Sequence, residues 1–224
     1  MTTAVSVERI DRGRSTLAHR VEELLRREIV RGIRPSGSRL NEVEIAAAYD
    51  VSRGPVREAM QRLARDGLVI IEPHRGAFVK SLDRTEVEDL YEIRSALEAE
   101  AAALAARKIT PEGIAQLRRM QEQSVSAVTQ EDDHSFPDVI DLHDLIGHVS
   151  GNRRLAALLQ QVNLELRLVR SRSGSSAERA QAALVEHDEL IERLASRDGD
   201  GARAAMRAHL DASLASTLAL MFSE

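Results

Sequence analysis

Three histidines occupy similar settings in the second half of this 224-residue chain. Each has apolar residues three or four positions away, which places its imidazole on the apolar stripe of a helix, toward a shared interior. They are His143, His187 and His209. A lone inward histidine is commonly a hydrogen-bonded core residue, but three unpartnered imidazoles are costly to bury. A divalent metal (zinc, or else nickel or manganese) would satisfy all three through neutral imidazole nitrogens.

Two arginines mark a second place where chemistry is expected. Arg53 and Arg57 are four residues apart, so they project side by side from the start of a short predicted helix. Ser52 is predicted to cap that helix with its hydroxyl, and Pro55 falls in the first turn, where a missing amide costs nothing. Paired guanidiniums at an exposed helix end suit guanine edges and phosphates in a DNA major groove. The plain alternative is a solvated helix face.

The elements around these arginines support the DNA-binding interpretation. An apolar helical stripe ends near Gly32, a second short helix spans 42–48, and the arginine helix follows. Strand-like runs at 68–71 and 77–79 flank a Pro/Gly turn, which predicts a hairpin. A hairpin after a helix-turn-helix is a wing, and its tip would hold His74, Arg75 and Gly76. We expect a winged helix-turn-helix (α+β) over 17–80.

The remainder of the chain reads as helical. After a polar linker at 81–84, breaks with turn and cap residues predict helices near 85–107, 111–130, 137–149, 152–172, 176–197 and 200–220. About six helices would form an all-α antiparallel bundle with a central cavity over 85–221. Residues 1–16 are polar and lack an apolar signal core, so they are predicted to be a flexible tail.

Composition and charge narrow the class of protein. Hydrophobic residues make up 43% of the chain and aromatic residues 2%, which favours helical cores of Leu, Ala, Val and Ile. The absence of cysteine excludes disulfides and thiolate metal ligands, and no apolar run has membrane-spanning length, so we expect a cytoplasmic protein. Residues 17–80 hold 12 basic and 9 acidic residues, whereas 85–224 hold 15 and 24. The acidic half should point away from DNA.

Leu40-Asn-Glu-Val-Glu-Ile-Ala46, Val51-Ser-Arg-Gly-Pro-Val-Arg-Glu-Ala59, Gly67-Leu-Val69 and Arg75-Gly-Ala-Phe-Val79 together closely resemble the winged helix of the GntR family of transcriptional regulators. The resemblance implies DNA contacts by Ser52, Arg53, Arg57 and Gly76. The family often has an arginine between the two acidic residues of the second helix, where this chain has Val43. A base contact that many relatives make is therefore expected to be absent.

Leu142-His143, Glu186-His187 and Met206-Arg-Ala-His209-Leu210, with Asn152 nine residues after the first histidine, resemble the FCD-type effector domain found in this family. The resemblance implies a metal held by the three histidines and an aspartate four residues before the first. This chain has Val139 at that position. Three alternatives stay open: helix distortion near Pro137 brings in Asp138, the metal has three protein ligands, or no metal binds. Asn152 is interpreted only as a helix cap.

The same resemblance implies a small carboxylate effector bound at the open metal positions. Arg94, in a stretch similar to one that lines the pocket of relatives, would be a second anchor for it; alternatively Arg94 pairs with Glu98 on the helix surface. The predicted function is a homodimeric repressor on a short palindromic operator. One alternative is a metal-dependent hydrolase, although no inward carboxylate shares the histidine stripes and no HExxH spacing occurs. The other is a metal-free dimerisation bundle fused to a DNA-binding domain.

Overall fold

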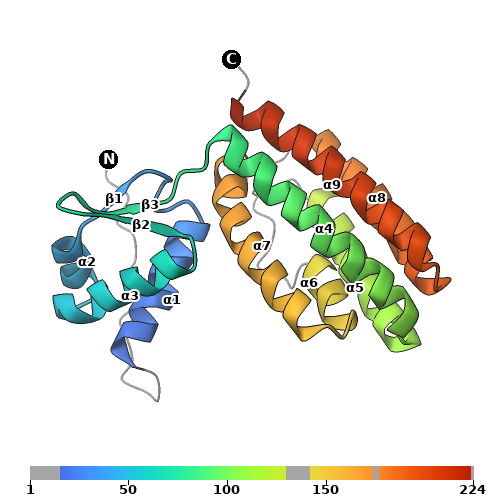
Figure 1. Ribbon diagram of the computed structural model, residues 1–224, viewed down its shortest axis with the longest axis horizontal. Helices are drawn as coiled ribbons and strands as arrows, with labels where there is room; N and C mark the ends of the chain where they lie inside the picture. The colour runs from blue at the N-terminus through green and yellow to red at the C-terminus, as the bar shows by residue number, and fades with distance from the viewer. Residues whose placement is uncertain (1–15, 130–141, 174–176, 223–224) are drawn as a thin grey trace. The chain divides into compact units, whose positions relative to one another are not determined.

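The computed structural model describes residues 16–129, 142–173 and 177–222, and the chain divides into two compact units between Leu82 and Asp83 (Figure 1). The predicted fold class, a winged helix-turn-helix followed by a helical bundle, is confirmed. Among the described helices, none combines the length and apolarity that crossing a membrane would need.

The first unit is the winged helix-turn-helix. Its elements are α1 (Leu17–Val30), β1 (Arg39–Leu40), α2 (Glu42–Ala48), α3 (Arg53–Arg65), β2 (Val69–Glu72) and β3 (Gly76–Val79). β3 pairs antiparallel with β2 and also with β1, so the sheet order is β1-β3-β2. The predicted hairpin is confirmed, but β1 was not predicted, because two residues are too few to show an alternating pattern.

Apolar stripes on α1 and α3 form the core of this unit. Val21, Leu25 and Ile29 of α1 are buried. So are the residues that repeat at helical spacing along α3, which are Val56, Ala59, Met60 and Leu63. Because these stripes repeat at helical spacing, they turn one face of each helix inward and leave the opposite face of α3 in solvent. That exposed face carries the arginines.

The second unit is an all-helical bundle whose elements agree with the predicted helices to within a few residues wherever they are described. They are α4 (Arg84–Lys108), α5 (Pro111–Thr129), α6 (Leu142–Val149), α7 (Arg153–Ser173), α8 (Ala177–Ala195) and α9 (Gly199–Phe222). α4 begins with a capping box, in which Asp83 and Glu86 bond each other's backbone amides. The residues predicted to start α6, 137–141, lie outside the described part of the chain.

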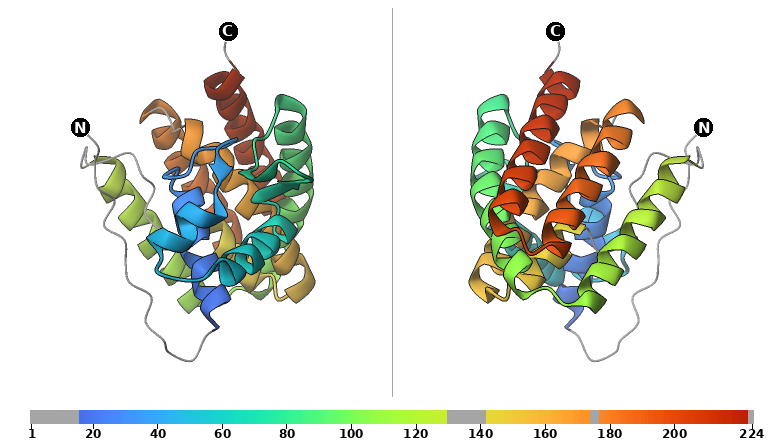
Figure 2. Two further views of the ribbon diagram at one scale, coloured as in Figure 1. Left: turned by 90° about the vertical axis from the view of Figure 1, so that its left-hand side faces the viewer. Right: turned by 90° about the vertical axis from the view of Figure 1, so that its right-hand side faces the viewer.

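α4 is the central helix of the bundle. It contacts α6, α7, α8 and α9, and it runs alongside α9 for most of its length (Figures 1 and 2). Small side chains make this close approach feasible: Ala99, Ala101, Ala102, Ala105 and Ala106 are all buried. The second half of α4 is buried on most of its circumference, so it shows no single apolar stripe there. α4 therefore carries side chains into the bundle interior, including charged ones.

Candidate DNA surface and histidine centre

The start of α3 presents the two predicted DNA-binding arginines to solvent. The side chains of Arg53 and Arg57 are 63% and 58% exposed. Ser52 occupies the N-cap position and is exposed, but its side chain makes no cap hydrogen bond, so the predicted capping role of its hydroxyl is wrong. Pro55 lies in the first turn of α3, where its missing amide costs nothing. An uncommitted hydroxyl at a helix N-terminus suits a phosphate contact.

Glu42, the first residue of α2, organises these arginines and was missed in the sequence. Its carboxylate accepts two hydrogen bonds from Arg57, from Nε at 3.1 Å and from Nη2 at 2.8 Å, and lies 3.9 Å from Arg53. The hydrogen bond from Arg57 lowers the pKa of the Glu42 carboxyl. These two hydrogen bonds use the Nε edge of the Arg57 guanidinium. The Nη1/Nη2 edge stays available, and that edge can bond guanine O6 and N7.

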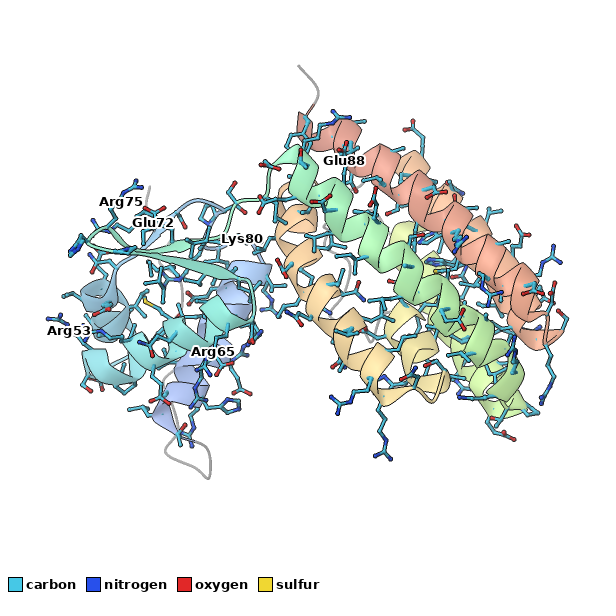
Figure 3. The ribbon with its side chains drawn as sticks, in the orientation of Figure 1. Arg53, Arg65, Glu72, Arg75, Lys80 and Glu88 are labelled. Carbon is cyan, nitrogen blue, oxygen red and sulfur yellow. The ribbon has the colours of Figure 1, made fainter. Side chains whose placement is uncertain are left out.

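The wing tip has the backbone geometry that its sequence suggests. His74 and Gly76 have φ angles of +62° and +110°, in the region that glycine tolerates best. Arg75 is exposed, pairs with Glu72 and lies over the ring of Phe78, with its guanidinium carbon 5.7 Å from the ring centre. Figure 3 shows Arg53 and Arg75 at the same edge of the unit, with Arg65 at the far end of α3.

β1 adds a basic side chain to the wing that was also missed in the sequence. The guanidinium of Arg39 lies 3.5 Å from the place where a β-carbon on Gly76 would stand. Arg39 is exposed and pairs in register with Phe78 of β3. Val43 of α2 is 57% exposed, so an apolar side chain faces solvent at the position where the resemblance implies an arginine in many relatives.

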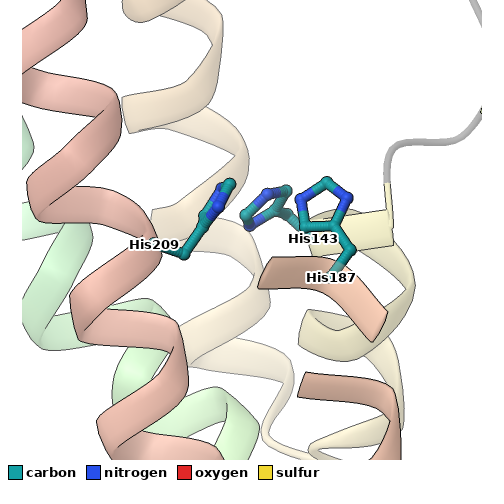
Figure 4. Close-up of side chains that lie close together, drawn as sticks. All are labelled: His143, His187 and His209. Carbon is teal, nitrogen blue, oxygen red and sulfur yellow. The ribbon is translucent and has the colours of Figure 1, made fainter. Parts of the chain in front are cut away.

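In the bundle, the three predicted histidines come together from three helices. His143 of α6, His187 of α8 and His209 of α9 have ring centroids 4.7–5.5 Å apart (Figure 4). One ring nitrogen from each lies within 4.8 Å of the others. His143 and His209 are buried and His187 is half-buried. Converging imidazoles from separate helices form a donor set suited to zinc-class metals.

A carboxylate from α4 holds the first histidine. Glu98 bonds Nδ1 of His143 with one oxygen and accepts a hydrogen bond from Nε of Arg94 with the other, at 2.6 Å. All three side chains are buried, and Arg94 is fully so. Burial opposes the charge on Glu98, but Arg94 and His143 outweigh it and lower the pKa of the carboxyl to about 2. Arg94 therefore pairs with Glu98 inside the bundle, and the predicted surface location of that pair is wrong.

A second carboxylate holds the third histidine in the same way. Glu186 of α8 lies 2.7 Å from Nδ1 of His209, and Arg179 binds both Glu186 oxygens, at 2.8 and 2.5 Å. Burial lowers the pKa of His209 most, and the proximity of the other two imidazoles and of Arg94 and Arg179 lowers it further, far below its ordinary value. No carboxylate was predicted on the histidine stripes themselves, and these two come from other positions: Glu98 lies on α4, and Glu186 of α8 reaches across to α9.

Two other predicted residues have different outcomes. Asp138, the alternative fourth metal ligand, lies outside the described residues, as does Val139. Asn152 is confirmed as a helix cap: its side-chain oxygen accepts a hydrogen bond from the amide of Leu155 at 3.2 Å, in the first turn of α7.

Known proteins match both units of the chain. Residues 17–79 match the family described as bacterial regulatory proteins of the gntR family, and residues 89–212 match the FCD domain. The transcriptional repressor RspR of Escherichia coli (strain K12) is 30% identical over 191 residues, which cover 85% of this chain and 84% of RspR. The uncharacterized regulator YdhC of Bacillus subtilis (strain 168) is 30% identical over 189 residues, 84% of each chain.

A solved GntR regulator from Rhodococcus sp. RHA1 has the same fold, with a TM-score of 0.73, 27% identity, and coverage of 91% of this chain and 98% of that one. These relatives are regulators of transcription, so the metal-dependent hydrolase alternative is set aside. This chain is a DNA-binding transcriptional regulator of the GntR family, with an FCD domain after its winged helix.

Proposed function

We propose that the protein is a repressor that binds a short palindromic operator as a homodimer and is controlled by a small carboxylate bound in the helical bundle. The observation that carries the DNA-binding part is the pair of exposed arginines at the start of α3, one of them held by Glu42 with its outer edge available. Repression is proposed because the relative RspR is a repressor. A dimer would match two-fold protein symmetry to two-fold operator symmetry.

In the proposed DNA complex, Arg53 and Arg57 read base edges or bind phosphates in the major groove, and Ser52 contacts a phosphate. His74, Arg75 and Gly76 bring the wing against the backbone, where the φ angle of Gly76 permits close approach. Without a side-chain donor at Val43, the operator should be less constrained at the base that this position reads in relatives.

For the bundle, we propose a divalent metal, zinc or else nickel or manganese, held by His143, His187 and His209. Three imidazoles leave coordination positions open, and a carboxylate oxygen is a suitable ligand for one of them. Arg94 and Arg179 lie beside the histidine centre, and their positive charges would favour such an anion. Arg94 is the proposed second anchor for the effector, and it bonds Glu98 through Nε.

Effector binding would then alter DNA affinity by favouring one arrangement of the two units over another. It can do so only if the effector binds the two arrangements with different affinity, typically by a factor of about 5 to 150.

The test begins with metal content. Protein purified without an affinity tag is assayed by elemental analysis, beside His187→Ala and a control, His148→Ala, which removes an exposed histidine of α6. Wild type and the control should hold about one equivalent of metal per chain, and His187→Ala should hold much less. No metal in wild type would favour the metal-free dimerisation bundle, and equal metal in all three would show that the metal is not held by the three histidines.

The effector is sought by thermal shift with a panel of small carboxylic acids, with and without a chelator. A hit is then added to an anisotropy titration of a labelled operator, chosen by selection from a random duplex pool. We expect stabilisation that the chelator abolishes and a change in operator affinity. If no acid shifts the metal-loaded protein, the proposed effector class is wrong.

A further inference from the structure

Two series of hydrogen-bonded side chains converge on the histidine centre. Each series has the same order: guanidinium, carboxylate, imidazole. Arg94 and Glu98 of α4 lead to His143 of α6. Arg179 and Glu186 of α8 lead to His209 of α9. The two series share no helix, yet each ends on the Nδ1 atom of an imidazole. The repeated arrangement indicates a common chemical role.

The tautomer of each imidazole follows from its carboxylate partner. An ionised carboxylate has only acceptor atoms, so the ring nitrogen facing it must carry the proton. In a neutral imidazole with a proton on Nδ1, the lone pair lies on Nε2, on the opposite side of the ring. The two contacts therefore set His143 and His209 with Nδ1–H toward a glutamate, which places the ring lone pair on Nε2.

Each glutamate is also paired with one guanidinium, which balances its negative charge beside the imidazole. A neutral imidazole is the form that ligates a metal.

One contact favours the opposite tautomer of His209, and the distances decide between the two. Nη2 of Arg179 lies 3.4 Å from Nδ1 of His209, and an arginine can only donate, which would require Nδ1 to be unprotonated. The Glu186 oxygen is at 2.7 Å from the same atom, well inside the normal range, whereas 3.4 Å is beyond it. Glu186 therefore determines the proton position.

We propose that Glu98 and Glu186 are positioning residues, which keep His143 and His209 in the Nδ1–H tautomer and so direct the Nε2 atoms of both rings to the metal. This inference rests on the metal site proposed above, but the tautomers exist in the metal-free protein and are tested there.

Glu186→Gln is the sharpest test, since Glu186 is partly exposed and its loss should leave the fold intact. The side chain of Gln has a single oxygen, and Arg179 would keep its hydrogen bond to that oxygen. The NH₂ group of the Gln would then face His209. An NH₂ group donates, and it would therefore invert the tautomer of His209 to Nε2–H. Glu98→Gln should do the same to His143. The controls are Glu192→Gln on α8 and Glu100→Gln on α4, whose partners Arg118 and Arg203 lie away from the histidines.

Two measurements apply to all variants. Long-range ¹H–¹⁵N spectra of the imidazoles in chelator-treated protein report the tautomer, and competition with a chromophoric chelator reports zinc affinity. We expect Nδ1–H signals for His143 and His209 in wild type and controls. Each variant should show the Nε2–H tautomer in the affected imidazole and a loss of zinc affinity of about 10- to 100-fold. If Glu98→Gln does not fold, Glu186→Gln decides alone.

Nε2–H signals in wild type, or a folded Glu186→Gln with unchanged tautomer and zinc affinity, would overturn the inference. Correct tautomers in a wild type that does not bind zinc would support the positioning role and would instead refute the proposed metal.

Discussion

Replacing Arg57 by alanine tests whether the recognition helix reads bases. Glu42 occupies two of the five N–H donors of the Arg57 guanidinium, at 3.1 and 2.8 Å. The three remaining donors include one on Nη1 and one on Nη2 that can bond a guanine edge together. A bidentate contact of this kind discriminates against a wrong base by about 5- to 150-fold, so Arg57→Ala should weaken operator binding by that factor.

Glu42→Gln should have a different signature. It removes a negative charge beside the DNA, so affinity for random duplex should rise. It also weakens an exposed ion pair that orients Arg57, and such pairs are worth little, so the ratio of operator to random affinity should fall by at most about fivefold. Arg65→Ala, at the other end of α3, is the control and should leave that ratio unchanged.

The assay is fluorescence anisotropy with the selected operator and a random duplex at several salt concentrations. Base reading by Arg57 requires that Arg57→Ala lose affinity mainly for the operator. If the affinities for both duplexes fall equally and the salt dependence decreases by about one counterion, Arg57 contacts a phosphate. The bidentate contact with a guanine edge would then be wrong. An unchanged affinity for both would remove Arg57 from the interface.

Three further outcomes are expected. Gly76→Ala should lower the free energy of unfolding by about 1–3 kcal/mol in urea denaturation, because φ at this position is +110°; an unaltered midpoint would show that the wing relaxes. Arg94→Met should lower the free energy of unfolding by about 3–5 kcal/mol, because it leaves Glu98 without its buried cation. Arg203→Met, which removes one partner of a surface ion pair, should change the urea midpoint little. Equal effects of the two substitutions would contradict the argument from burial. Chelator should lower the melting temperature of metal-loaded wild type and not that of His187→Ala, and a drop in both would indicate metal elsewhere.

Local pattern was enough to predict the helices and the wing. The stripe of α3, the hairpin and the cap by Asn152 depend on neighbours within a few residues, so spacing and turn chemistry specify them. The histidines too could be predicted to point inward, since each lies on the apolar stripe of its own helix. The hydroxyl cap by Ser52 failed because a suitable residue type at the N-cap does not determine where its side chain turns.

The partners of the key side chains could not be predicted in this way. Glu42 and Arg57 are 15 residues apart, Glu98 and His143 are 45 apart, and Glu186 reaches 23 residues along the chain to His209. Such pairs form only when helices pack in one particular register, and many registers would bury the same apolar stripes.

The chain alone therefore determined what kind of protein this is, because the winged-helix motif and the three histidines are encoded at short range. Only the tertiary structure decided which carboxylates bond Arg57, His143 and His209. A glutamate is favourable beside a buried histidine or arginine only at hydrogen-bonding distance, and that distance is a property of helix packing rather than of spacing along the chain.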